Sequence, residues 1–121
     1  MKKDNVVQEK SYAFALECIK LYQMLTKEKR EFILSKQLLR STTSIGANVE
    51  EAIGGQSTRD FLSKMSIAYK ETREAHYWLR LLRDSENIEK KDSEMLISKC
   101  DELLRLIGSI QKTIKSKLDN S

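Results

Sequence analysis

The chain has 121 residues, enough for one domain whose hydrophobic core needs no disulfide or metal for support. Proline is absent and glycine occurs only four times, so little interrupts helices and little favours strands. Charged residues make up 33% of the chain and the formal net charge is +4, which permits nucleic-acid binding without requiring it. The composition predicts an all-α fold in a single domain over residues 1–121 and excludes a fold built mainly on strands.

The first expected helix covers about residues 5–25. Apolar side chains recur there at three- and four-residue spacing, the pattern of an amphipathic helix: Val7, Phe14, Cys18, Leu21 and Leu25. Residues 26–31 contain no apolar side chain. We therefore predict a solvated turn after this helix.

The second helix is expected at about residues 35–53, with Ser35 as its N-cap. Its buried stripe is predicted to contain Leu38, Thr42, Ile45, Val49 and Ala52. Gly54 and Gly55 follow, and we expect them to end the helix through a left-handed residue.

The third helix is predicted at residues 58–84. Ser57 and Asp60 have the spacing of a capping box, in which the serine hydroxyl accepts a hydrogen bond from the amide of residue 60. Its inner stripe is expected to hold Phe61, Met65, Ala68, Thr72, Ala75, Leu79 and Leu82.

The last helix is predicted at about residues 89–118. Near-heptad spacing marks its apolar stripe: Leu96, Cys100, Leu103, Ile107, Ile110 and Ile114. Short connections between four such helices favour an up-and-down antiparallel four-helix bundle.

We expect neither a signal peptide nor a membrane span. Residues 6–10 lack a continuous apolar run, and no window approaches the about 20 apolar residues of a membrane helix. Cys18 and Cys100 are isolated and fall on apolar stripes, so we expect small buried side chains that stay reduced. The sequence predicts a cytoplasmic protein.

Enzyme signatures are missing. Di-iron bundles use Glu-x-x-His, but the single histidine, His76, follows Glu74 by two positions and Glu71 by five. Arg73 lies three positions before His76, closer than the spacing used by helical ribonucleases. We expect no catalytic residue, cofactor or metal, and we interpret His76 as a packed or interfacial polar residue.

One polar set stands out on the two middle helices: Arg40, Asn48, Glu51, Glu71 and Glu74. The pair Asn48 and Glu51 and the pair Glu71 and Glu74 are each one turn apart, and antiparallel packing would bring the pairs together. The set would either support a ligand or nucleic-acid groove or form a salt-bridge network that fixes the register of helices or subunits.

Basic side chains gather near the first turn and second helix, along the third helix, and at residues 112–117. If these three clusters formed one stripe, they would contact phosphates, although a charge run is also typical of a solvated face. The candidate nucleic-acid-binding residues are Lys36, Arg40, Arg73, Arg80 and Arg83.

Large apolar side chains on the third helix suggest self-association, because a contiguous exposed patch is costly in water. The candidate oligomer interface comprises Ile67, Tyr77, Trp78 and Leu81. Alternatively, Trp78 closes one edge of the core of a single chain.

A family resemblance rests on residues 37–52, which read QLLRSTTSIGANVEEA, together with Ser57, Phe61 and residues 77–79. These residues resemble the core motif of four-helix bundle proteins encoded in intervening sequences of large-subunit ribosomal RNA genes. Accessory variability determinant proteins of diversity-generating retroelements are relatives of that family. Many members carry proline where this chain has Gly46.

The resemblance implies an up-and-down bundle that assembles into a ring, with a pentamer as the expected state. Retroelement relatives bind a reverse transcriptase and nucleic acid through basic surfaces. Our first hypothesis is a non-enzymatic homo-oligomer that binds RNA or a ribonucleoprotein. The alternative is a protein scaffold that recruits a partner helix or a reverse transcriptase without touching nucleic acid.

Overall fold

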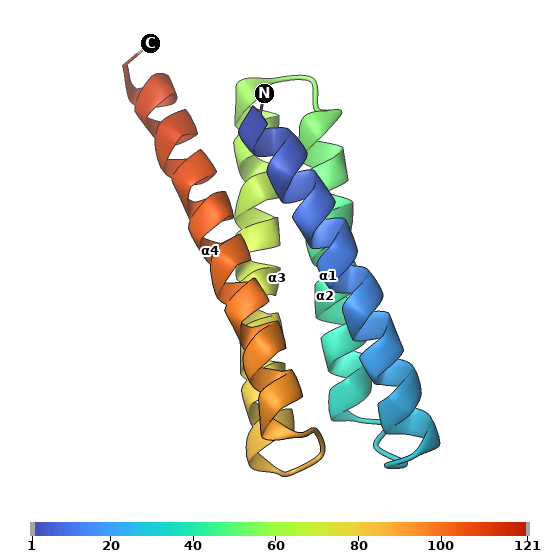
Figure 1. The fold of residues 1–121 in the computed structure, drawn as a ribbon. Coiled ribbons are helices and arrows are strands. Elements are labelled where there is room, and N and C mark those ends of the chain that lie inside the picture. The colour runs from blue at the N-terminus through green and yellow to red at the C-terminus, as the bar shows by residue number, and fades with distance from the viewer. Residues whose placement is uncertain (1, 121) are drawn as a thin grey trace.

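The computed structural model describes residues 2–120, with side chains from residue 6 onward, and this part of the chain forms four helices. They are α1 (Lys2–Lys27), α2 (Leu34–Ile53), α3 (Thr58–Asp84) and α4 (Lys90–Asp119). Each helix runs antiparallel to the one before it, so α1 begins and α4 ends at the same end of the bundle (Figure 1). The predicted up-and-down four-helix bundle is confirmed.

The helices pack against their neighbours around the bundle, α2 with α3 most extensively and α1 with α4 least. The C-terminal part of α4 leans away from the other helices (Figure 1). The two most extensive helix–helix interfaces therefore lie on either side of α3. We call them the α2–α3 seam and the α3–α4 seam.

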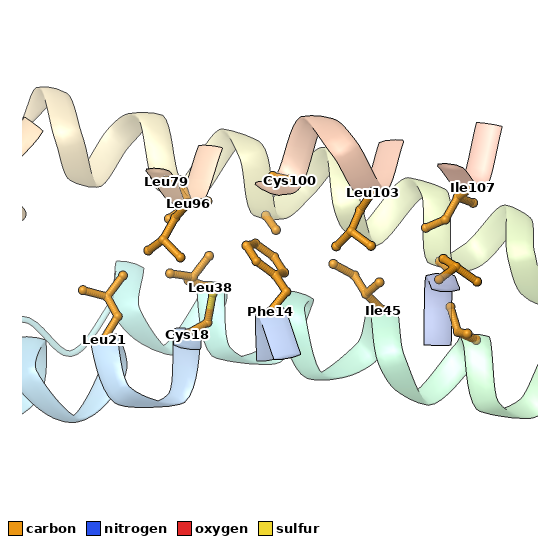
Figure 2. Close-up of a cluster of buried hydrophobic side chains, with 14 of the residues drawn as sticks. Phe14, Cys18, Leu21, Leu38, Ile45, Leu79, Leu96, Cys100, Leu103 and Ile107 are labelled. Carbon is orange, nitrogen blue, oxygen red and sulfur yellow. The ribbon is translucent and has the colours of Figure 1, made fainter. Parts of the chain in front are cut away.

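One hydrophobic core runs through the bundle. Figure 2 shows side chains of all four helices pointing into it, among them Phe14, Leu38, Leu79 and Leu103, which are all at most 2% exposed. Burying one such side chain contributes about 1.5–3 kcal/mol to folding. Every residue of the expected apolar stripes is buried except Phe61, which is half-buried and packs against the core.

Both cysteines are free and buried, as predicted. Burial raises the pKa of each thiol to about 12. Because only the thiolate is nucleophilic, Cys18 and Cys100 act as small apolar side chains at neutral pH.

The prediction of Ser35 as the N-cap of α2 is wrong, because Ser35 is buried inside the first turn. The carboxylate of Glu31 takes that role and accepts hydrogen bonds from the amides of Ile33, Leu34 and Ser35 at 2.7–3.2 Å. Burial pushes the pKa of Glu31 upward, but these hydrogen bonds outweigh it and hold the pKa below its ordinary value of 4.5. The expected capping of α3 is confirmed, since Ser57 Oγ accepts from the Asp60 amide at 3.0 Å.

The left-handed exit expected at Gly54 and Gly55 is also wrong. Gly54 has φ −85°, and no glycine has a positive φ in the described part of the chain. Left-handed residues occur instead after α1 and α3, at Arg30 with φ 55° and Glu86 with φ 62°. The left-handed positions in these two turns are thus occupied by residues other than glycine.

Candidate nucleic-acid interface

Two residues of the serine and threonine run at positions 41–44 of α2 face the interior, whereas Thr43 is exposed. Ser41 and Thr42 are fully buried, and their hydroxyls donate to the carbonyls of Gln37 at 2.9 Å and Leu39 at 3.2 Å. These bonds within the helix satisfy the buried hydroxyls without a ligand. Ser41 and Thr42 therefore have a packing role.

Gly46 lies where α1 crosses α2. A methyl group at this position would stand 3.9 Å from the carbonyl oxygen of Ser11, which is ordinary van der Waals contact. The two helices are in contact here, and an alanine would fit as well as the glycine.

The α2–α3 seam carries a charge network. Arg40 contacts Glu71 Oε2 at 3.1 Å and also pairs with Glu74, whose Oε1 accepts from Trp78 Nε1 at 3.1 Å. Burial raises the pKa of Glu74, but the bonds from Arg40 and Trp78 prevail and keep it below its ordinary value of 4.5. The Arg40 charge is therefore largely neutralised, and the interpretation as an interhelical salt-bridge network is confirmed for these residues.

The other half of the predicted polar set lies elsewhere. Asn48 Nδ2 donates to the Ser44 carbonyl of its own helix at 2.9 Å, and Glu51 pairs with Lys64 at 3.4 Å. The expectation that Asn48 and Glu51 meet the glutamates of α3 is wrong. Because the helices are antiparallel, the partners of residues near the end of α2 come from the start of α3.

The α3–α4 seam is built around His76. Its Nε2 donates to Asp101 Oδ1 at 3.0 Å, and its Nδ1 accepts from Arg80 Nε at 3.0 Å. The Arg80 guanidinium also lies 5.7 Å from the centre of the Tyr77 ring. His76 is an interfacial polar residue, as predicted, and it holds Arg80 in place without neutralising it.

The remaining basic candidates differ in their pairing. Lys36 on α2 and Arg73 on α3 are exposed and form no ion pair among the described side chains. Arg83 is paired with its neighbour Asp84 at 2.8 Å. Of the five sequence candidates, Arg40 and Arg83 are engaged by carboxylates and the others keep their charge available.

The three basic clusters do not form one stripe. The α1–α2 turn lies at one end of the bundle, and the end of α4 lies at the other (Figure 1). Arg40 faces the α2–α3 seam, whereas Arg80 faces the α3–α4 seam. The antiparallel fold separates clusters that look equivalent along the sequence.

The candidate oligomer interface on α3 is partly exposed. Ile67 and Tyr77 are 40% and 46% exposed, whereas Leu81 and Trp78 are half-buried. Trp78 packs against the core, as the alternative interpretation expected, and its ring lies edge-on to Tyr77. Two large apolar side chains thus remain on the outer face of this helix.

Sequence reasoning missed the polar contacts between α1 and α4. Lys99 pairs with Glu17, and Lys10 pairs with Glu102 at 3.2 Å. The sequence signal for these contacts was a lysine and a glutamate at short spacing on each of the two helices. Lysine precedes glutamate on both helices, and this same order gives complementary pairs when the helices pack antiparallel.

The described residues show neither a candidate metal site nor a membrane-spanning helix. They contain no group of three or more His, Cys, Asp and Glu side chains that could hold a metal ion. Nor does this part of the chain include a helix long and apolar enough to cross a membrane.

The fold and its seams define a small helical bundle whose polar motif residues mostly serve packing. Residues 3–109 match the model of the 23S rRNA-intervening sequence protein family, and the chain belongs to that family. It is similar to a crystal structure of a protein with unknown function from the S23 ribosomal protein family of Bacteroides thetaiotaomicron VPI-5482. The two share 47% identity with a TM-score of 0.89, over 91% of this chain and 98% of the other. Comparison with curated proteins finds no match.

Proposed function

We propose that this protein is a non-enzymatic cytoplasmic homo-oligomer that binds RNA or a ribonucleoprotein. The observation that carries the proposal is the presence of accessible cations, above all Arg73 and Arg80, which form no ion pair with a described carboxylate. Such cations displace the counterions of a phosphate backbone. The names of the family and of the similar structure both refer to the ribosome or its RNA.

Fluorescence anisotropy with a structured RNA at several salt concentrations tests the binding. We expect affinity that falls steeply with salt and that drops about tenfold at low salt in the double variant Arg73→Glu with Arg80→Glu. The matched control is Lys20→Glu with Lys27→Glu, which reverses two exposed lysines of α1 that form no ion pair among the described side chains. Unchanged affinity in the α3 variant, with an unchanged melting temperature, would remove the proposed surface.

Self-association into a ring, with five copies as the proposed state, is supported by the apolar side chains left on the outer face of α3. Five times the 14.0 kDa chain mass is about 70 kDa, which light scattering measures directly. Ile67→Lys with Tyr77→Lys is expected to lower this mass, whereas Met95→Lys, at another half-exposed apolar position on α4, is the control. A mass of one chain for the native protein would contradict the assembly.

The same exposed side chains favour a second candidate, a scaffold that recruits a partner helix, such as one from a reverse transcriptase. Capture of a partner that resists nuclease and is lost in Tyr77→Ala would favour the scaffold over RNA binding. Capture that nuclease abolishes would favour RNA.

A further inference from the structure

An open groove lies between α3 and the C-terminal part of α4, where α4 leans away from its neighbours (Figure 1). Tyr69 of α3 lines one side, and Gly108, Gln111, Lys112 and Lys115 of α4 line the other. Lys112 and Lys115 belong to the basic cluster at residues 112–117, but none of these groove residues is among the five candidate nucleic-acid-binding residues named from the sequence. The groove combines an aromatic ring, an amide and two cations.

Gly108 explains why the ring lies in the groove. A methyl group added at Gly108 would be 3.5 Å from Tyr69 Cε2, so the ring packs over the bare backbone of α4. Tyr69 is half-buried, and the part of it that lines the groove is accessible. An aromatic ring fixed in this way is a preorganised stacking surface.

The cations of the groove are available. Lys112 and Lys115 are exposed, lie one turn apart, and form no ion pair among the described side chains. Gln111 is anchored by a 3.1 Å hydrogen bond from its Nε2 to Ser66 Oγ. Gln111 is thus held in place on the α4 side of the groove, while Lys112 and Lys115 remain free to reach a phosphate.

Charge continues along the same seam in one direction only. Arg73 follows Tyr69 by one turn, and Arg105 precedes Lys112 by two turns; both are exposed. At the other end, Asp119 lines the groove and the negative end of the α4 dipole disfavours anions. A polyanion is therefore expected to run from the groove toward the middle of the bundle.

We propose that this groove binds single-stranded RNA, with an unpaired base stacked on Tyr69 and its phosphates on Lys112 and Lys115. The inference rests on the proposed RNA binding and gives it a place and a class of ligand. Stacking requires a base that is not already stacked in a duplex, so the groove favours single strands over double helices.

The test measures anisotropy of a fluorescent short oligouridine and of an RNA duplex of matched length. Tyr69→Leu keeps an apolar side chain and is expected to weaken oligouridine binding about tenfold, while duplex binding changes little. Tyr69→Phe keeps the ring and is expected to bind as the native protein does. Lys112→Gln with Lys115→Gln is expected to reduce the log–log salt slope by about 1.4, against no change for Lys20→Gln with Lys27→Gln.

The outcomes separate the groove from RNA binding in general. If native protein binds oligouridine but neither the Tyr69→Leu nor the lysine variant differs from it, the groove is overturned and RNA binding stands. If native protein binds neither RNA, both proposals fail. Should Tyr69→Leu melt earlier than the native protein, the lysine variant decides, because its two side chains are exposed and support no packing.

Discussion

The two sides of α3 use arginine in opposite ways. On the α2–α3 seam, Arg40 is engaged by two glutamates, one of which also binds Trp78. On the α3–α4 seam, Arg80 donates to His76 Nδ1, and Asp101 binds the other side of that ring. The first arrangement uses the charge for packing, whereas the second fixes a guanidinium and leaves its charge available.

This difference shows that a count of basic residues does not locate a basic surface. Arg40 and Arg80 are equally prominent in the sequence, yet only the pairing across each seam decides which of them can attract a phosphate. The following variants break or sharpen the comparison, beginning with the largest expected effect.

Trp78→Ala breaks the α2–α3 seam. Trp78 is half-buried against the core and donates to Glu74, so its loss removes both apolar burial and a hydrogen bond. We expect the free energy of unfolding to fall by about 2–3 kcal/mol, less than for a fully buried tryptophan. Urea denaturation measures this, with Tyr12→Ala, a 64% exposed position, as the control. A loss no larger than that of the control would mean that the seam does not depend on Trp78.

Local signals predicted the fold. Apolar spacing marked all four helices, and the Ser57 cap could be predicted because its hydrogen bond spans only three residues. Glu31 was missed as the cap of α2 because its carboxylate acts across a non-helical turn that the sequence pattern describes only as solvated. Periodicity also fixes which face of a helix is buried but not how far one helix slides along another.

That missing axial register explains the errors at the candidate site. Asn48 and Glu51 were expected beside the glutamates of α3, but Glu51 meets Lys64 and Asn48 bonds within α2. Tyr69 was not singled out as a site residue, because its place over Gly108 depends on the register of α3 against α4. Contacts within a helix are predictable from spacing, whereas contacts across a seam require the packed structure.

Glycine replacements compare close helix contacts on opposite sides of the bundle. Alanine is favoured over glycine by about 1 kcal/mol in a helix interior. At Gly46 the added methyl meets Ser11 at 3.9 Å, and at Gly108 it meets the Tyr69 ring at 3.5 Å. We expect Gly46→Ala to gain about 1 kcal/mol in unfolding free energy and Gly108→Ala somewhat less. Destabilisation by Gly46→Ala would show that α1 and α2 pack more tightly than these distances indicate.

Glu74→Gln tests how the α2–α3 seam responds to acid. The pKa of Glu74 is lowered on folding, so its stabilising effect is fully present above its unfolded value of 4.5 and is lost as the pH falls through the folded value. We expect the variant to lose about 0.5 kcal/mol at neutral pH, because Arg40 is half-exposed. The stability curves of variant and native protein should converge in acid. A constant difference at every pH would contradict the pairing, and Glu9→Gln, at an exposed position, is the control.

The smallest expected effect comes from a variant in which Arg40 on the α2–α3 seam loses its carboxylate partners, as Arg80 on the α3–α4 seam already lacks such partners among the described side chains. Glu71→Gln with Glu74→Gln releases Arg40 from its carboxylates and makes it resemble Arg80. RNA affinity at low salt should rise a few-fold, and the log–log salt slope should steepen by about 0.7 to 0.9, the value of one added phosphate contact. Glu9→Gln with Glu28→Gln changes the net charge equally at exposed positions that form no described ion pair. An equal gain in both variants would mean that net charge, rather than a released guanidinium, governs the affinity.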